Sequence, residues 1–195
     1  MALVTKKIYD SGFQFFTLKT LQDILQIKKE ATFYSVLKRL LKNGVLLKIE
    51  RDKYLLKNGK ANNFSLANFL YKPSYVSFES ALNIYGILSQ FPQETTSATP
   101  RKTKEKIING RIFSFTHLKK SLFWGYEKKK DFLIALPEKA FLDQLYLASK
   151  GLKSNNLDEY DLSFVNQAKV KRLIKKFPKT RQFKSIVEKV KEFLN

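Results

Sequence analysis

The sequence contains no cysteine and only one histidine among its 195 residues. Disulfides and thiolate metal sites are therefore excluded, and His117 has no second imidazole with which to share a metal ion. No apolar run approaches the length of a membrane-spanning helix, and the opening stretch MALVTKKIYDSG has no apolar core of signal-peptide length. We therefore expect a cytoplasmic protein that needs no cofactor and has no membrane partner.

Groups typical of catalysis are also scarce. The lone His117, in SFTHLKK, is more simply explained as a structural residue at a strand end. Glu138 and Asp143 lie five positions apart on one predicted helix, which places them on different faces. The NGK sequence lacks the glycine spacing of a phosphate-binding loop, and no nucleophile and base can be paired. We expect no enzyme, although a nucleic-acid-processing enzyme remains a competing class.

Acidic residues are few beside the basic ones: 17 Asp and Glu face 37 Lys and Arg, a formal charge of +20. Residues 1–60 contain 13 basic and 5 acidic side chains (+8), residues 61–150 contain 13 and 7 (+6), and residues 151–195 contain 11 and 5 (+6). Such an excess attracts polyanions, of which nucleic acid is the commonest. A Lys-rich surface without such a partner is the alternative.

The first sixty residues have the pattern of three short helices. Apolar spacing predicts a first helix over residues 3–8 that ends at Ser11-Gly12, and Thr17 is a candidate N-cap for the second. A third helix is expected from about Lys29 to Asn43. Two short helices cannot bury the apolar stripe of the third, so a further element must close this core.

A short hairpin follows the third helix directly. Gly44 supplies a left-handed residue that ends the helix, and VLLKI and KYLLK are β-rich runs around the charged turn Glu50-Arg51-Asp52. Three helices and a hairpin within about sixty residues predict a winged helix-turn-helix for residues 1–60.

On a helical wheel, the third helix has an apolar side and a polar side. The apolar side, which we expect to be packed, holds Phe33, Tyr34, Leu37, Leu40 and Leu41. The polar side and the hairpin supply the candidate DNA contacts: Lys28, Lys29, Thr32, Ser35, Lys38, Arg39, Lys48, Arg51 and Lys53. Outward helix side chains can reach base edges in a major groove, and hairpin cations can neutralise phosphates. A basic helix face is also common as solvated surface, and winged helices also serve as protein-binding modules.

The rest of the chain is expected to form a second domain. Residues 61–70 are polar and turn-rich at their start, which predicts a linker. For residues 71–195 the sequence pattern predicts a mixed α/β domain with a helical C-terminal tail. Together with the winged helix-turn-helix, this predicts the α+β class for the whole chain. A helix is expected after Ser77, and a second from Pro137 to a stop at Gly151.

Strand signals lie between these two helices. ETTSATP and DFLIAL are typical of strands, and KIINGRIFSFTHL predicts a hairpin about its Asn-Gly turn. Residues 157–195 are expected to be all-helical, with a break at FPKT.

Three segments in this order resemble the AbiEi-type antitoxin family: SYVSFESALNIYGILSQFPQETTSAT, GRIFSFTHLKKSLFWGYE and ALPEKAFLDQLYL. The family also begins with a winged helix whose second wing strand has a GVY-like sequence, where this chain has DKY at residues 52–54. The resemblance covers nearly the whole chain. It implies the antitoxin half of an abortive-infection (phage-defence) toxin–antitoxin system.

The resemblance also implies two partners and a division of labour. Such proteins repress their own operon by binding inverted repeats in its promoter DNA, and their second domain counteracts a nucleotidyltransferase-like toxin. Candidate antitoxin surfaces are the basic clusters Arg101, Lys102 and Lys104; Lys128, Lys129 and Lys130; and Lys171, Arg172, Lys175 and Lys176. Ordinary solvated surface is the alternative for each cluster. The alternative function is a winged-helix regulator with a basic RNA- or protein-binding second domain and no toxin partner.

Overall fold

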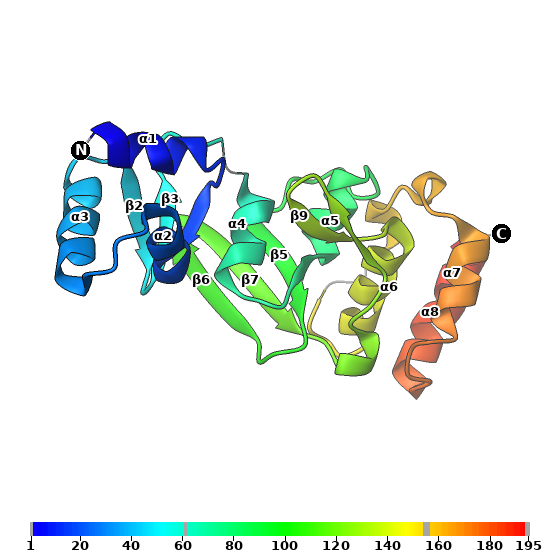
Figure 1. Cartoon of the computed structure of the whole chain (residues 1–195). Helices are drawn as coiled ribbons and strands as arrows, with labels where there is room; N and C mark the ends of the chain where they lie inside the picture. Colours follow the sequence, from blue (N-terminus) through cyan, green and yellow to red (C-terminus); the bar gives the residue numbers. More distant parts are fainter. Residues whose placement is uncertain (1, 61, 154–156, 194–195) are drawn as a thin grey trace. The chain divides into compact units, whose positions relative to one another are not determined.

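The computed structural model describes residues 2–60, 62–153 and 157–193, and the chain is of mixed α and β structure (Figure 1). It divides into two compact units, Met1–Asn62 and Asn63–Asn195. Residue 61, in the predicted linker, and residues 194 and 195, in the last predicted helix, lie outside the described residues. No helix in the described part of the chain is long and apolar enough to cross a membrane.

The first unit combines three helices with a small antiparallel sheet. Its elements are α1 (Ala2–Asp10), β1 (Phe15–Thr17), α2 (Leu18–Leu25), α3 (Glu30–Lys42), β2 (Leu46–Glu50) and β3 (Lys53–Leu56). The strand order is β1-β3-β2, so the strand before α2 pairs with the second strand of the hairpin. The core gathers side chains from every helix and strand of the unit, including Ile8, Phe16, Leu21, Leu40 and Tyr54.

The ends of these helices follow from local chemistry. The predicted N-cap Thr17 is confirmed: its hydroxyl accepts a hydrogen bond from the Thr20 amide at 3.1 Å. Gly44 follows α3 with φ +65°, and the Val45 amide returns to the Leu40 carbonyl at 2.9 Å. This left-handed glycine turns the chain directly into β2.

One assignment on α3 is wrong. The helical wheel predicts Tyr34 on the packed face, but 46% of its surface is exposed. It lies at the edge of the apolar stripe, where its ring packs edge-on against Phe33 with the centroids 5.5 Å apart. The long aromatic side chain therefore covers the core rather than entering it.

The second unit is built on a six-stranded mixed sheet. Its strands are β4 (Tyr75–Val76), β5 (Glu94–Thr99), β6 (Lys104–Ile108), β7 (Arg111–His117), β8 (Tyr126–Lys129) and β9 (Phe132–Ala135). Their order is β6-β7-β5-β4-β9-β8, with β5–β7 and β4–β9 parallel and the other pairs antiparallel. The predicted hairpin about Asn109-Gly110 is confirmed as β6–β7.

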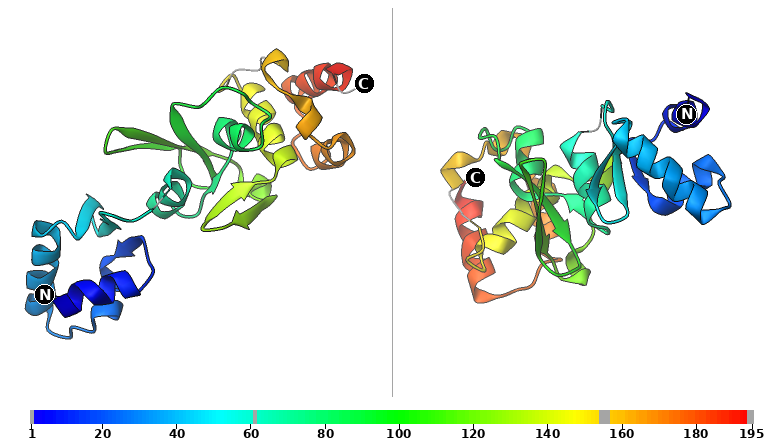
Figure 2. Two further views of the ribbon diagram at one scale, coloured as in Figure 1. Left: turned by 90° about the horizontal axis from the view of Figure 1, so that it is seen from above. Right: turned by 90° about the vertical axis from the view of Figure 1, so that its left-hand side faces the viewer.

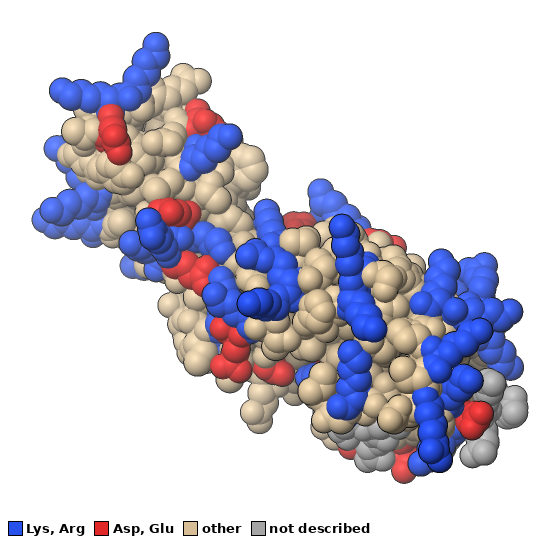
Figure 3. Space-filling view, turned by 90° about the horizontal axis from the view of Figure 1, so that it is seen from below, with Lys and Arg blue, Asp and Glu red and all other residues tan. Residues whose placement is uncertain are grey.

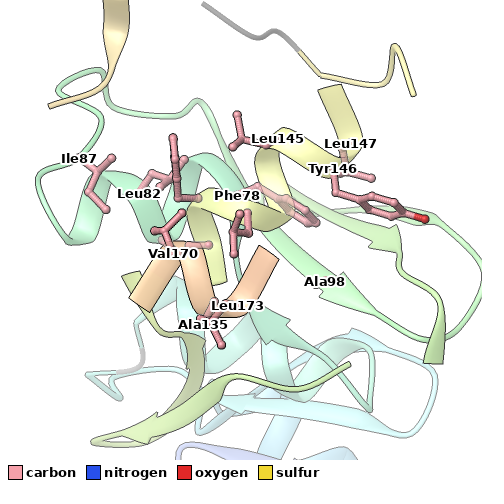
Figure 4. Packing of buried hydrophobic residues seen from close by; sticks show 14 of the residues in the cluster. Phe78, Leu82, Ile87, Ala98, Ala135, Leu145, Tyr146, Leu147, Val170 and Leu173 are labelled. Atoms are coloured by element: carbon pink, nitrogen blue, oxygen red, sulfur yellow. The ribbon is translucent and has the colours of Figure 1, made fainter. Parts of the chain in front are cut away.

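Helices cover this sheet in layers. They are α4 (Asn63–Leu70), α5 (Phe78–Ile84), α6 (Pro137–Ala148), α7 (Gln167–Ile174) and α8 (Arg181–Phe193). In Figures 1 and 2, α6 lies between α5 and the sheet on one side and α7 and α8 on the other. Figure 4 shows Val170 and Leu173 of α7 meeting Phe78 and Leu82 of α5 in the same core. Consequently every residue of α6 from Glu138 to Leu147 is buried.

The predicted linker is wrong over residues 63–70, which form α4. Its residues Leu66, Ala67 and Leu70 are buried in the second unit. The helix has only eight residues and neither acidic nor basic residues at its ends, so the usual helix signals are missing. Apolar burial against the sheet, and not local propensity, accounts for it.

Candidate nucleic-acid interface

The exposed face of α3 brings together most of the predicted DNA contacts. Lys28 and Lys29 precede the helix, and Thr32, Ser35, Lys38 and Arg39 lie on it; all are exposed. They alternate with Phe33, Leu37 and Leu40, which are buried in the core. Since the buried side fixes the rotation of the helix, the polar side must face outward.

The charge along α3 is uneven. Lys29 occupies the N-cap position with no side-chain cap, and Glu30 is the only acid in the first turn. Arg39 and Lys42 lie in the last turn, where cations also favour the helix dipole. The middle and end of the helix are therefore the most basic part of this face.

The hairpin adds fewer free cations than its sequence suggests. Lys48 is exposed on β2, and the Arg51 side chain at the turn is 95% exposed, with its Nε 3.8 Å from Asp52. Lys53 differs, because its Nζ lies 3.0 Å from a Glu50 carboxylate oxygen and its side chain is largely covered. An internal ion pair already neutralises Lys53, so Lys48 and Arg51 are the better candidates for phosphate contacts.

In the second unit, one basic cluster surrounds a single aromatic ring. The Arg101 guanidinium lies 4.5 Å from the centre of the Tyr71 ring, with Lys104 and Lys106 at 6.0 and 5.7 Å. Arg101 also donates to the Lys72 carbonyl at 2.9 Å. Cation–π contact holds these charges together on the surface. The third predicted member of this cluster, Lys102, is exposed beside them.

The other two basic clusters lie elsewhere on the second unit. Lys128 and Lys129 end β8 and Lys130 follows in the turn, whereas Lys171, Arg172, Lys175 and Lys176 lie at the end of α7 and just beyond it. Strand β6, which carries Lys104, and β8 form opposite edges of the sheet. Figure 3 shows Lys and Arg side chains spread over both units on the face drawn. Lys104 and the Lys128–Lys130 cluster thus lie at opposite edges of the sheet, whereas Lys176 of the third cluster lies 4.9 Å from the centre of the Trp124 ring, two residues before β8.

A buried ion pair on α6 was missed by sequence reasoning. Lys139 and Asp143 are fully buried and joined through Nζ and Oδ1. Tyr75 and Ser77 each donate a hydroxyl hydrogen bond to the other Asp143 oxygen at 3.0 Å, and Lys139 Nζ donates to the Tyr75 hydroxyl oxygen at 2.9 Å. The ammonium also faces the Trp124 ring, 5.0 Å from its centre. The only sequence signal was the i,i+4 spacing of the two charges.

Burial sets the electrostatics of this pair. Desolvation raises the pKa of Asp143, and the Lys139 charge and the hydrogen bonds from Lys139, Tyr75 and Ser77 oppose the rise. Desolvation likewise lowers the pKa of Lys139, and Asp143 opposes that change. Each charge thus depends on the other to remain ionised in the interior.

The other titratable residues considered from the sequence have separate partners. Glu138 lies 2.8 Å from the Lys169 ammonium, so it does not share a site with Asp143. His117 is exposed, and its Nδ1 lies 2.8 Å from the Arg101 carbonyl oxygen. Among the described residues, no group of three or more His, Cys, Asp or Glu side chains is placed to hold a metal ion.

Comparison of the sequence with protein-family models found no matching family, and a search of curated proteins found no match either.

Proposed function

We propose that the chain is a DNA-binding antitoxin that represses its own operon. In this proposal, residues 1–60 are a winged helix-turn-helix, α3 is the recognition helix and the β2–β3 hairpin is the wing. The observation that carries the proposal is the exposed face of α3, whose polar and basic side chains are held outward by a packed apolar side. A β-hairpin with Arg51 at its tip follows that helix directly.

The chemistry of this face suits duplex DNA. A major groove admits an α-helix, and Thr, Ser and Arg side chains can hydrogen-bond to base edges there. Lys28, Lys48 and Arg51 would contact phosphates, which fix the position of the helix but carry no sequence information. One such domain covers a short half-site, so we expect two copies on an inverted repeat in the promoter.

The antitoxin role rests on the resemblance to the AbiEi-type family and on the charge outside the first sixty residues. Residues 61–195 carry +12 of the total +20, from 24 basic and 12 acidic side chains. Such a surplus exceeds what solubility requires of a small domain and favours an acidic or phosphate-bearing partner. The partner we propose is a nucleotidyltransferase-like toxin, or the nucleic acid on which it acts.

The double variant Lys38→Ala with Arg39→Ala should lose most of its affinity for the promoter. Each lost phosphate contact lowers the slope of log affinity against log salt by about one, and a lost base contact costs about tenfold or more. Fluorescence anisotropy with a labelled promoter fragment, measured from low to high salt, gives both quantities.

The matched control for this test is Lys6→Ala with Lys7→Ala. It removes the same charge from exposed positions of α1. The control should keep the wild-type salt slope to within about half a unit, since it removes no predicted contact. Equal losses in both double variants would mean that only net charge attracts DNA, and would remove α3 from the interface.

The antitoxin function should survive loss of DNA binding. A cell that expresses the proposed nucleotidyltransferase-like toxin should be rescued as well by the full chain carrying Lys38→Ala and Arg39→Ala as by the wild type. Both proteins are expressed from a foreign promoter, so that repression does not alter their amounts. Loss of rescue by a variant that still accumulates would show that neutralisation needs the α3 face, which contradicts the proposed division of labour.

A further inference from the structure

A pocket of about 360 Å³ lies in the second unit, beside the β8–β9 hairpin and the segment that leads from α4 into β4. Its lining includes the aromatic rings of Phe123 and Tyr126, the cations Lys72 and Lys128, the carboxylate of Asp131 and the hydroxyl-bearing Ser74. This volume suits a small ligand or one unit of a polymer. None of the predicted DNA contacts on α3 takes part in it.

The Ser74 hydroxyl is the clearest sign that the pocket binds a ligand. Only 2% of this residue is exposed, and its Oγ has no hydrogen-bond partner among the described residues. Buried hydroxyl groups are normally paired, and Ser74 lines the pocket, so a rotation of its side chain would offer the orphan hydroxyl to a bound molecule.

Phe123 and Tyr126 form an aromatic wall of the pocket, and both rings pack against the buried Tyr75. Phe123 and Tyr126 have their ring centres 5.2 Å apart, and Tyr75 lies behind both rings, stacked 4.7 Å from Tyr126. Tyr75 is fully buried, and its hydroxyl is fixed by Lys139 and Asp143. The buried ion pair therefore orients the wall, which offers a preorganised surface for a planar ring.

Charge around the pocket favours an anion that also carries a polar ring. Lys72 and Lys128 supply two cations, and Arg101, which bonds to the Lys72 carbonyl, begins the basic cluster around Tyr71. Asp131 also lines the pocket and accepts a hydrogen bond from Ser65 at 2.5 Å. A carboxylate beside the lysines disfavours a bare phosphate but can accept from a base N–H group.

We propose that this pocket binds one nucleotide of a single-stranded nucleic acid. The base stacks on Phe123 and Tyr126, its phosphate lies against Lys72 and Lys128, and the Ser74 hydroxyl bonds to the bound nucleotide. The neighbouring phosphates follow the basic cluster that includes Arg101 and Lys104. A free nucleotide has the same base and phosphate, so both sources are compared in the test.

The test measures binding of the full-length protein to labelled single-stranded RNA and DNA octamers by anisotropy, and to ATP, GTP, CTP and UTP by calorimetry. Lys128→Ala should weaken binding by about tenfold, since it removes a charge-assisted contact. Lys189→Ala is the matched control: it removes the same charge from an exposed position of α8 that does not line the pocket, so it should change affinity by less than about twofold.

Ser74→Ala separates binding from folding. Because the hydroxyl has no partner in the protein, this variant should melt at or above the wild-type temperature while binding the octamers more weakly. Binding of octamers alone supports a strand as the natural ligand, and equal binding of one free nucleotide, with the same loss in Lys128→Ala, supports a nucleotide. The proposal is overturned if no probe binds, or if Lys128→Ala and Ser74→Ala bind as tightly as the wild type.

Discussion

Replacing Lys139 by Met is expected to destabilise the second unit by about 3–5 kcal/mol, the usual cost of breaking a buried ion pair from one side. The variant leaves Asp143 with hydrogen bonds from Tyr75 and Ser77 but no counterion, in a site with no exposed surface. The size of a methionine side chain keeps the loss of packing small. Urea unfolding followed by tryptophan fluorescence measures the change, since Trp124 lies beside the ammonium.

The double variant Lys139→Met with Asp143→Leu provides the internal control. It removes both charges together, so it should be more stable than Lys139→Met alone, and the two changes should show strong coupling. Lys102→Met, an exposed lysine exchanged in the same way, should change stability by less than about 0.5 kcal/mol. If Lys139→Met were as mild as Lys102→Met, the ion pair would not hold this core together.

The loss of unfolding free energy in Lys139→Met, relative to the wild type, should shrink as the pH is lowered from 7 towards 5. Without the Lys139 charge, the burial that raises the pKa of Asp143 is opposed only by the hydroxyl hydrogen bonds. A carboxyl whose pKa is higher in the folded than in the unfolded state stabilises the fold at low pH, and that contribution is lost as pH rises through the folded pKa. Urea midpoints of the variant and the wild type at pH 5 and pH 7 test the sign. A deficit that grew on acidification would mean that Asp143 is not the group left unpaired.

Local signals in the sequence were enough to predict several elements. Thr17 caps α2, Gly44 ends α3, and the Asn-Gly turn joins β6 to β7, because each depends on residues close in the chain. Strands β1 and β4 have only three and two residues, too few for an alternating pattern to be detected. They exist because distant strands supply their hydrogen bonds.

The groups that line the pocket and the buried ion pair depend on topology, which the sequence does not reveal. Tyr75 reaches Asp143 because β4 lies in the middle of the sheet, paired with β5 and β9. Lys139 would lie on a solvated face if α7 and α8 did not pack over α6. An i,i+4 pair of opposite charges is typical of exposed helices, so its burial could not be inferred from spacing alone.

Replacing Phe33 by Ala is expected to cost the first unit about 3–5 kcal/mol and to abolish promoter binding at physiological temperature. Phe33 is fully buried in the core of a unit of about sixty residues, and domains of that size have little stability to lose. The core of the second unit contains none of these residues, so its unfolding should be unchanged. Limited trypsin digestion with mass spectrometry should therefore release a stable fragment that begins near residue 63.

Tyr34→Ala is the matched control, since this neighbouring aromatic is half-exposed and its replacement should cost no more than about 1 kcal/mol. Loss of both units in Phe33→Ala would show that they fold as one, because the damage would then have spread beyond the core that contains Phe33.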